Sequence, residues 1–341
     1  MRFGQHFPRS ALAAGIVSAL LTSPGLVSAQ TKLSVGMPTN PPNVVHTPMY
    51  IAKDLGFYKA EGVDVELLSF EGGVYSFRAM VSGDVDLAAS SAPFAIVARG
   101  NGAKTRFVFS TTPRLESSMV VQSNIKTLKD LKGRRVGIQE PGGFAFVLSM
   151  MVLNAAGLKK DDVELVSILS EDVPPLVAGQ IDTAILHVEQ EIVALGRKPS
   201  LHVLARLGEI VPKQMYLAYA AREDTIAKKR KALLTLVKGN IQAARLIYTD
   251  RKKALPIIVQ HTGLDEGVAN KTLDILIKNC AWDVNAGLPR EMVEFTTTRM
   301  VKIGNLDAAK APKYEDVVDL SLAEQALKEL GPYTGSVCST K

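Results

Sequence analysis

The chain has 341 residues, and its 40 Lys and Arg residues against 34 Asp and Glu residues give a formal net charge of +6. That length is too great for one simple core and predicts two domains. The charges are dispersed except at residues 228–231, which begin a helical pattern and are expected to face solvent, so a nucleic-acid partner is not expected. After the N-terminal segment no stretch has 18 consecutive apolar residues, which predicts a soluble mature protein.

The first 29 residues have the pattern of a secretory signal peptide. Arg2 and Arg9 precede an uncharged, mostly apolar run at residues 11–21, and residues 27–29 supply small side chains at a cleavage position. We expect cleavage before Gln30, export to the periplasm, and a mature net charge of +4, because two basic residues and no acidic residue are removed. No Cys stands at the cleavage position, so a lipid-modified N-terminus is not expected. An uncleaved membrane anchor is the alternative.

Two cysteines are present, Cys280 and Cys338. Export would allow a disulfide between them, because it places the chain in an oxidising compartment. Two cysteines so far apart in sequence could equally be buried singly or lie in a loose tail. The sequence leaves these alternatives open.

Between residues 32 and 114, short β-branched runs alternate with helical periods, a pattern typical of an α/β protein with mainly parallel sheets. Thr47 followed by Pro48 predicts the start of a helix, because proline is tolerated at the first helical position. Gly83 is expected to end a second helix. The expected strands are residues 32–36, 63–70 and 85–89, and the expected helices are residues 48 to 56 or 62, 75–82, and from 93 onward.

A second unit with the same order of elements follows Arg114. A glycine pair at residues 142–143 leads into a long helix that Gly157 is expected to end. The expected strands are residues 135–139, 164–169 and 181–186, and the expected helices are residues 128–131, 144–156 and 173–178. Two such units predict two α/β lobes.

Beyond an expected strand at residues 216–221 the pattern changes to amphipathic helices, at residues 224–249, 252–261, 265–278 and 290–303. Such helices need a sheet or one another to cover their apolar faces, and we expect them to pack mainly on the first lobe. The predicted first lobe is therefore residues 30–113 with 222–341, and the second is residues 114–221. The predicted crossings between the lobes are residues 110–114 and 220–222.

Four segments, in order along the chain, carry a family resemblance. Residues 48–67 (PMYIAKDLGFYKAEGVDVEL), 81–87 (VSGDVDL), 128–137 (LKDLKGRRVG) and 176–184 (LVAGQIDTA) resemble signatures of the nitrate, sulfonate, taurine and thiamine-precursor binding proteins, the NMT1/THI5-like family. The resemblance covers most of residues 32–225. It implies a type II periplasmic-binding-protein fold with two crossover segments, serving an ABC importer. It implies no particular ligand, since members of the family bind inorganic anions, alkanesulfonates, pyrimidines and aromatic acids.

In open α/β sheets, ligands bind outside the carboxyl ends of the strands, where helix N-termini offer free backbone N–H groups. Four strand-to-helix loops qualify, at residues 37–48, 90–93, 141–144 and 187–189. Glycines there would allow a close backbone approach, and an aromatic ring would offer a stacking surface. The predicted ligand-binding residues are Thr39, Asn40, His46, Ser90, Ser91, Gly142, Gly143, Phe144, His187 and Glu189. No metal or cofactor is expected, because the five histidines are scattered.

These candidates also have purely structural interpretations. Ser91 could only cap a helix, residues 142–143 could only make a turn, and His46 could be a partly exposed loop residue. Arg114 could pair with an anionic ligand or cap the first crossing, and Trp282 is expected in the core. The four loops contain no Lys or Arg, so a polar, zwitterionic or aromatic organic solute is at least as consistent with them as a bare sulfonate.

Two other functions are open on the sequence alone. A binding protein of this kind could feed a sensor rather than an importer, because the docking surface would differ and not the pocket. An enzyme resembling the yeast-type thiamine-pyrimidine synthases is disfavoured, since those carry a cysteine-rich motif that this chain lacks, and no hydrolase, zinc-protease or P-loop motif is present. We therefore expect a non-enzymatic monomer whose partners are a small molecule and the permease of an importer.

Overall fold

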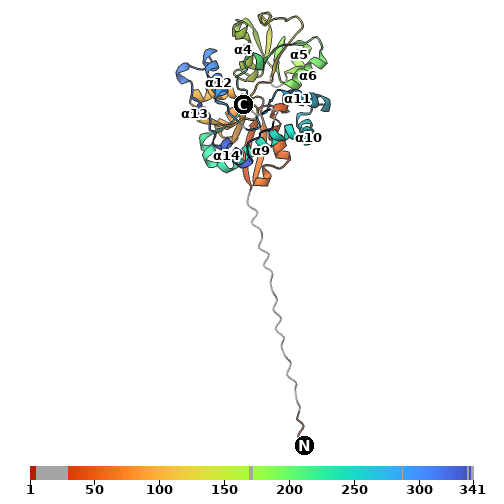
Figure 1. The fold of residues 1–341 in the computed structure, drawn as a ribbon, viewed down its shortest axis with the longest axis vertical. Helices are drawn as coiled ribbons and strands as arrows, with labels where there is room; N and C mark the ends of the chain where they lie inside the picture. The colour runs from red at the N-terminus through yellow and green to blue at the C-terminus, as the bar shows by residue number, and fades with distance from the viewer. Residues whose placement is uncertain (5–29, 169–171, 286, 336–337, 339–341) are drawn as a thin grey trace.

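The computed structural model describes residues 1–4, 30–168, 172–285, 287–335 and 338. Within these residues the chain forms two α/β lobes, each built on a five-stranded sheet and stacked one above the other in Figure 1. The predicted signal peptide lies almost entirely outside the described residues. None of the helices in the described ranges is both long enough and apolar enough to cross a membrane.

The first sheet joins strands from distant parts of the sequence. Its strands are β1 (Thr31–Met37), β2 (Val63–Ser69), β3 (Leu87–Ser91), β4 (Thr105–Phe109) and β10 (Leu217–Arg222), in the order β2-β1-β3-β10-β4. β1 runs parallel to β2 and β3, whereas β10 is antiparallel to β3 and β4. β3 is buried along its whole length, as expected for a central strand covered on both faces.

The second sheet repeats this plan. Its strands are β5 (Ser118–Val121), β6 (Arg135–Ile138), β7 (Glu164–Ser167), β8 (Thr183–Leu186) and β9 (His202–Arg206), in the order β7-β6-β8-β5-β9. β6 is parallel to β7 and β8, and β5 is antiparallel to β8 and β9. Each sheet thus has a parallel part with one strand inserted antiparallel beside it. The predicted fold class, α/β with two lobes, is confirmed.

Helices follow the parallel strands and cover the sheets, because a parallel connection must cross over the sheet. In the first lobe they are α1 (Pro48–Asp54), α2 (Gly73–Ser82) and α3 (Ala92–Gly100), with the short segments η1 (Val44–His46) and η2 (Lys59–Glu61). In the second lobe they are α4 (Phe144–Ala155), α5 (Val173–Ala178), α6 (Val188–Arg197) and α7 (Leu207–Ile210), with η3 (Leu128–Leu131) and η4 (Lys160–Asp162). Pro48 and Pro93 stand in first helical turns, as predicted.

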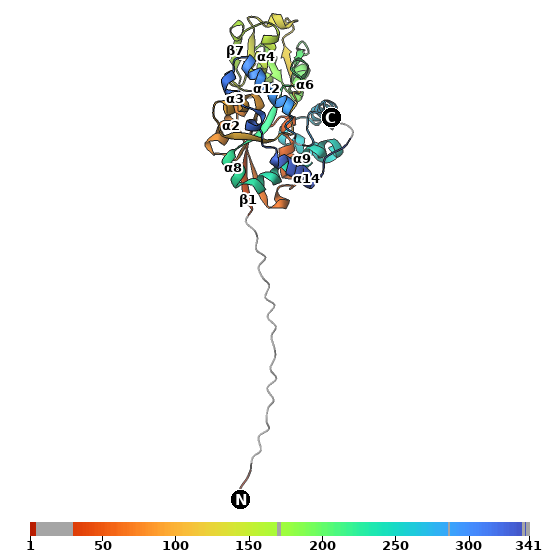
Figure 2. The ribbon, with the colours of Figure 1, turned by 60° about the vertical axis from the view of Figure 1, so that its left-hand side comes forward.

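The C-terminal part of the chain is helical, as predicted. It consists of α8 (Glu223–Lys228), α9 (Arg230–Thr249), α10 (Arg251–Thr262), α11 (Glu266–Lys278), α12 (Arg290–Lys302), η5 (Ala308–Lys310), α13 (Tyr314–Val317) and α14 (Ser321–Leu330). α9 packs on α1 and α14, and α12 packs on α3. Figure 2 shows α9 and α14 at the base of the molecule, beside the first sheet. α11 also contacts α6 of the second lobe.

Several element boundaries differ from the sequence-based expectation. The helix predicted over residues 224–249 is two helices, because Lys229 leaves helical geometry (φ −112°, ψ 23°) and its ammonium group pairs with Asp86 at 2.8 Å. Asp86 also accepts a hydrogen bond from the Ser34 backbone N–H at 2.9 Å, and β3 begins after it rather than at residue 85. β4, β5, β9, α7, α13 and α14 were not predicted, and α6 was implied only by the expectation of a strand-to-helix loop at residues 187–189. The strand expected at 164–169 ends at residue 167, and residue 169 lies outside the described ranges.

The second crossing between the lobes lies earlier than predicted. The chain leaves the first sheet after Phe109 and enters the second at Ser118, in agreement with the first predicted crossing. It leaves the second sheet after Arg206, and β10 already pairs with β3 at Leu217, opposite Ser91. The predicted boundary between residues 221 and 222 is therefore wrong. The strand assigned to the end of the second lobe inserts between β3 and β4 of the first, and hydrophobic periodicity cannot tell which sheet a strand joins.

The segment that follows α11 is hydrogen-bonded to the first crossing between the lobes. Cys280 and Cys338 form a disulfide, with their Cα atoms 5.3 Å apart. The Arg114 guanidinium group donates a hydrogen bond to the Cys280 carbonyl at 3.1 Å, and the Asp283 backbone N–H donates to the Thr111 carbonyl at 2.8 Å. Of the two roles considered for Arg114, the structure therefore shows the capping of the crossing.

Trp282 ties the same segment to the first lobe. Its side chain is fully buried, as predicted for a core residue, and its indole N–H donates to the Val45 carbonyl at 3.0 Å. Val45 lies in η1, between β1 and α1. The C-terminal segment is therefore attached to the first strand-to-helix loop as well as to the crossing.

Replacing both cysteines by serine (C280S/C338S) is expected to lower the free energy of unfolding by about 4 kcal/mol, because the disulfide closes a loop with a sequence separation of 58 residues. Urea unfolding of the wild type and the double variant, each with and without a thiol reductant, measures this difference. The reductant should destabilise the wild type and leave the variant unchanged. A wild type that unfolds at the same urea concentration in both conditions would contradict the stabilising role of this disulfide.

Candidate functional site

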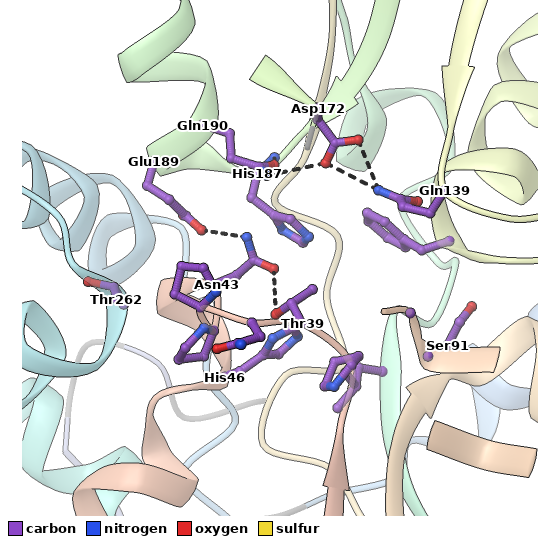
Figure 3. A pocket seen from close by; sticks show the side chains of 18 of the residues that line it. Thr39, Asn43, His46, Ser91, Gln139, Asp172, His187, Glu189, Gln190 and Thr262 are labelled. Atoms are coloured by element: carbon purple, nitrogen blue, oxygen red, sulfur yellow. Dashed lines mark hydrogen bonds between the residues drawn. The ribbon is translucent and has the colours of Figure 1, made fainter. Parts of the chain in front are cut away.

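A cleft with a volume of about 180 Å³ lies between the two lobes (Figure 3). It forms where strands of both sheets end, which is where α/β sheets place their ligand sites. The first lobe contributes residues 38–43, His46, Gly72, Gly73 and Ser91, the second contributes Gln139, Glu140, Phe144, Asp172, His187, Glu189 and Gln190, and the lining is completed by Tyr216, Leu217, Thr262 and Leu264. All four predicted loops meet at this cleft.

Most of the predicted ligand-binding residues line the cleft. They are Thr39, Asn40, His46, Ser91, Phe144, His187 and Glu189, and their contact with a solute stays a prediction. His46 is only 2% exposed, so the interpretation as a partly exposed loop residue is wrong. Ser91 stands before α3, but its hydroxyl makes no capping hydrogen bond, so helix capping does not account for it.

The other three predicted residues, Ser90, Gly142 and Gly143, are not among the residues that line the cleft. The Ser90 hydroxyl donates to the Gly73 carbonyl at 3.2 Å and is fully buried. Gly142 adopts φ +82°, which a turn with glycine accommodates without strain. At Gly143 a Cβ atom would lie 2.6 Å from the Glu140 carboxyl group, so this glycine makes room for a side chain of the protein itself.

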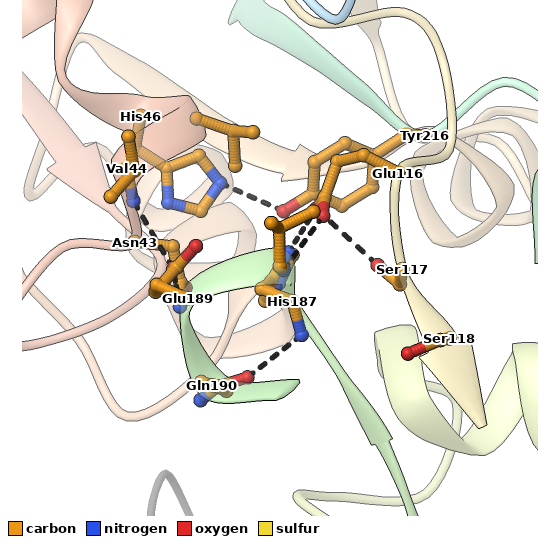
Figure 4. Close-up of polar contacts among 12 residues, drawn as sticks. Asn43, Val44, His46, Glu116, Ser117, Ser118, His187, Glu189, Gln190 and Tyr216 are labelled. Carbon is orange, nitrogen blue, oxygen red and sulfur yellow. Dashed lines mark hydrogen bonds and ion pairs between the residues drawn. The ribbon is translucent and has the colours of Figure 1, made fainter. Parts of the chain in front are cut away.

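A buried ion pair holds the N-terminus of α6 (Figure 4). His187 Nδ1 contacts one oxygen of Glu116, and the other oxygen accepts a hydrogen bond from the Val188 backbone N–H at 3.1 Å. Burial would lower the pKa of His187, but neighbouring carboxylates, foremost that of Glu116, outweigh burial and raise this pKa to about 9. His187 is therefore an imidazolium at neutral pH.

The second histidine of the cleft is neutral. Burial, and then repulsion from His187, lower the pKa of His46 to about 3. Its Nε2 lies 2.8 Å from the Tyr216 hydroxyl, and burial raises the pKa of this phenol well above its usual range. The Tyr216 phenol therefore keeps its proton and can donate a hydrogen bond to Nε2 of the neutral His46 ring. Within the described residues, His46 Nδ1 has no hydrogen-bond partner.

Three rings, those of Phe144, His187 and Tyr216, form an aromatic wall. The rings of Phe144 and His187 are stacked, with centroids 5.1 Å apart and planes at 7°. Tyr216 packs against both at a tilt, with centroid distances of 4.7 Å to Phe144 and 5.6 Å to His187. Stacked rings of this kind present flat surfaces on which a further ring can stack.

Glu189 joins the two lobes. One of its carboxylate oxygens accepts hydrogen bonds from Asn43 Nδ2 at 2.9 Å and from the Val44 backbone N–H at 3.2 Å (Figure 4). Glu189 belongs to α6 of the second lobe, whereas Asn43 and Val44 follow β1 of the first. Burial, and then repulsion from Glu116, raise the pKa of Glu189. Its second oxygen has no hydrogen-bond partner among the described residues.

Asp172 is held by two side-chain amides. Gln139 Nε2 donates to it at 3.1 Å and Gln190 Nε2 at 3.2 Å, and burial raises its pKa to about 6. Among the described residues that line the cleft there is no Lys or Arg. In the part of the chain that the structure describes, no group of three or more His, Cys, Asp or Glu side chains is placed to hold a metal ion.

Several important residues were missed by sequence reasoning. Gln139 and Glu140 directly follow β6, and Asp172 directly precedes α5, so the rule that selected the four loops could have found them. Glu116 and Tyr216 flank the two crossings. Only the pairing of the strands into two sheets shows that Tyr216 lines the cleft and that Glu116 contacts His187, and no local pattern marks them.

Solved structures show the fold of this chain. A protein from Bordetella bronchiseptica superimposes with a TM-score of 0.78 at 19% identity, covering 89% of this chain and 99% of that chain. The ligand-binding component of an ABC-type import system from Staphylococcus aureus, solved with zinc bound, gives a TM-score of 0.67 at 15% identity, covering 87% of this chain and 99% of that chain. The fold is thus of the type II periplasmic-binding-protein kind, as the resemblance implied.

Sequence comparison adds a relative and a family. A formylaminopyrimidine-binding protein from Halalkalibacterium halodurans is 24% identical over 255 residues, which cover 70% of this chain and 74% of that protein. The family model described as "NMT1/THI5 like" matches residues 43–254, more than half of the chain. The chain therefore belongs to the NMT1/THI5-like family.

Proposed function

We propose that this protein is the extracytoplasmic solute-binding component of an ABC importer, and that its solute is a small planar organic molecule of the pyrimidine class. Membership of the NMT1/THI5-like family supports the binding role. The likeness to an import-system component and to a formylaminopyrimidine-binding protein supports the importer and the solute class.

The aromatic wall is the observation that carries the solute class. Phe144 and His187 are already stacked at 7°, so a planar ring entering the cleft extends an existing stack and orders no new side chain. The hydroxyl of Ser91 and Nδ1 of His46, both without partners among the described residues, provide hydrogen-bonding groups for the edge of such a ring. A small tetrahedral or trigonal anion would leave the aromatic surface unused.

The proposed mechanism is closure of the lobes around the solute. Ser91 of the first lobe and Phe144 of the second both line the cleft, so one solute contacts both lobes at once. A solute with contacts in both lobes binds the closed form more tightly than the open form and shifts the population towards it. The closed form then docks on the permease and delivers the solute.

We propose that the protein acts in the periplasm as a monomer. The signal-peptide pattern of residues 1–29 supports export, although most of that segment lies outside the described residues. The Cys280–Cys338 disulfide also supports this location, since disulfides persist in oxidising compartments.

The contacts of the two histidines support binding rather than catalysis. In a common form of nucleophilic catalysis, a histidine acts as the base for a serine or cysteine within hydrogen-bond reach. In the described structure His187 instead contacts Glu116, and His46 contacts Tyr216. Both histidines are therefore engaged in holding the walls of the cleft.

A thermal-shift screen tests the proposed solute class. Pyrimidines and other planar ring compounds should stabilise the protein, because a ligand at 100 times its dissociation constant adds about 2.7 kcal/mol of stability. Phe144→Leu should weaken ring binding roughly two- to tenfold, the value of one aromatic contact. Phe57→Leu, a half-buried phenylalanine away from the cleft, is the matched control and should bind like the wild type. Stabilisation by nitrate and alkanesulfonates alone would overturn the proposed class.

The protonation of His187 predicts that the stability of the protein depends on pH. Because the pKa of His187 is raised from 6.5 to about 9, its contribution to stability is fully present below about pH 6.5 and is lost as the pH rises through about 9. NMR titration of the imidazole signals should give a pKa near 9 for His187 and no titration of His46 above pH 5. Glu116→Gln should lower the pKa of His187, because the foremost neighbouring carboxylate is removed. A wild-type His187 that titrates at or below 6.5 would contradict this electrostatic account.

A further inference from the structure

Two carboxylates of the second lobe accept hydrogen bonds from backbone N–H groups of the first lobe. Glu189 accepts from the Val44 N–H at 3.2 Å, and Glu140 accepts from the Val74 N–H, in the first turn of α2, at 3.4 Å. Free N–H groups at helix starts are the groups with which a protein binds an anion without using Lys or Arg. In this protein, two such N–H groups already donate to the carboxylates of Glu140 and Glu189.

Two glycines make room for one of these carboxylates. A Cβ atom at Gly72 would lie 2.7 Å from the Glu140 oxygens, and one at Gly143 would lie 2.6 Å from its carboxyl group. Gly72 belongs to the first lobe and adopts φ +139°, a conformation that side-chain-bearing residues rarely adopt. The glycines on both sides of the cleft therefore fit around the carboxylate of Glu140 and leave no room there for a larger side chain.

The second oxygen of each carboxylate has no partner in the described structure. These atoms are Glu140 Oε2 and Glu189 Oε2, on residues that are 6% and 4% exposed and that line the cleft. Buried charged oxygens without partners are costly, and a group that donates to them recovers that cost. Burial raises the pKa of both carboxyl groups and outweighs the opposing effects of the Val74 N–H on Glu140 and of the charge of His187 on Glu189.

The charge around the cleft is unbalanced. The described lining holds the carboxyl groups of Glu140, Asp172 and Glu189 and one imidazolium, that of His187, and it contains no Lys or Arg. Glu116, which pairs with His187, and Arg78, whose charge lowers the pKa of Glu140, lie outside this lining. An anion placed here would meet like charges in a poorly solvated space, whereas a cation would meet opposite charges.

Building on the proposed function, we infer that the solute is a planar ring that carries a positive charge, such as a protonated amine. Glu140 and Glu189 are its specificity-determining residues. Their first oxygens hold the lobes together through N–H groups of the first lobe, and their second oxygens receive the N–H groups of the cation. The same pair excludes anionic solutes by repulsion.

A series of probes that differ only in charge tests this inference. Benzylamine, benzyl alcohol and benzoate share one ring and carry charges of +1, 0 and −1 at neutral pH. Isothermal titration calorimetry of the full mature protein should give the tightest binding for benzylamine and the weakest for benzoate. Hydrogen bonds to charged groups predict that benzylamine binds about ten- to a hundredfold more tightly than benzyl alcohol.

The variants Glu140→Gln and Glu189→Gln test whether these two carboxylates cause the preference for benzylamine. Glutamine keeps the oxygen that accepts from the first lobe and replaces the other oxygen with an amide NH₂, so the contact between lobes is retained while the charge is removed. Each variant should lose most of the preference for benzylamine over benzyl alcohol, because one of the two carboxylates that receive the cation is then neutral. Glu164→Gln, an exposed glutamate of β7 in the same lobe, is the matched control and should keep the full preference.

The outcomes separate this inference from the proposed function. If ring compounds bind but benzoate binds as tightly as benzylamine or more tightly, the cationic solute is overturned and the proposed function stands. If neither the three probes nor any pyrimidine binds, the proposed function falls too. Should a glutamine variant fail to fold, as judged by circular dichroism, the charge series on the wild type still decides.

Discussion

The buried ion pair between Glu116 and His187 sets the geometry of the cleft. One carboxylate engages both the ring of His187 and the backbone N–H of Val188, so it fixes a side chain and the first turn of α6 together. With the ring fixed, Phe144 stacks on it, and Glu189, on the same turn, faces Asn43 of the other lobe. Removing either partner would leave a buried charge uncompensated, which is far more costly than the loss of a surface ion pair.

The two lobes bring different chemistry to the cleft. The first lobe contributes neutral groups, namely backbone N–H groups, the amide of Asn43, the hydroxyl of Ser91 and the neutral ring of His46. The second lobe contributes the carboxylates, the imidazolium and the phenylalanine ring. Closure therefore brings a charged surface against a neutral, hydrogen-bonding one. At the cleft, the polar attraction between the lobes is directional and depends on matched donors and acceptors.

Much of the fold could be predicted because its signals are local. Alternation of short apolar runs with helical periods gave the α/β class, and the position of loops after strands gave the four segments that meet at the cleft. The errors come from long-range pairing. Residues 216–221 have the pattern of a strand in either lobe, and only the partners of β10 place it beside Ser91. Glu116 escaped prediction for the same reason, since its partner stands 71 residues away.

Residues 142–143 illustrate a second limit of sequence reasoning. A glycine pair before a helix predicts close approach, and the structure confirms close approach at Gly143. What approaches is the carboxyl group of Glu140 and not a solute. The sequence can indicate that space is needed, but the identity of the group that fills it depends on how the loop folds back on its own strand.

The attachment of Trp282 gives the molecule a further property. The chain has one tryptophan, and its indole N–H is bonded to the Val45 carbonyl, between Val44, which Glu189 contacts, and His46, which lines the cleft. Indole fluorescence responds to changes in hydrogen bonding and polarity around the ring. We therefore expect the emission of this tryptophan to change as the lobes join and part, which would give the native chain an optical reporter without any dye or label.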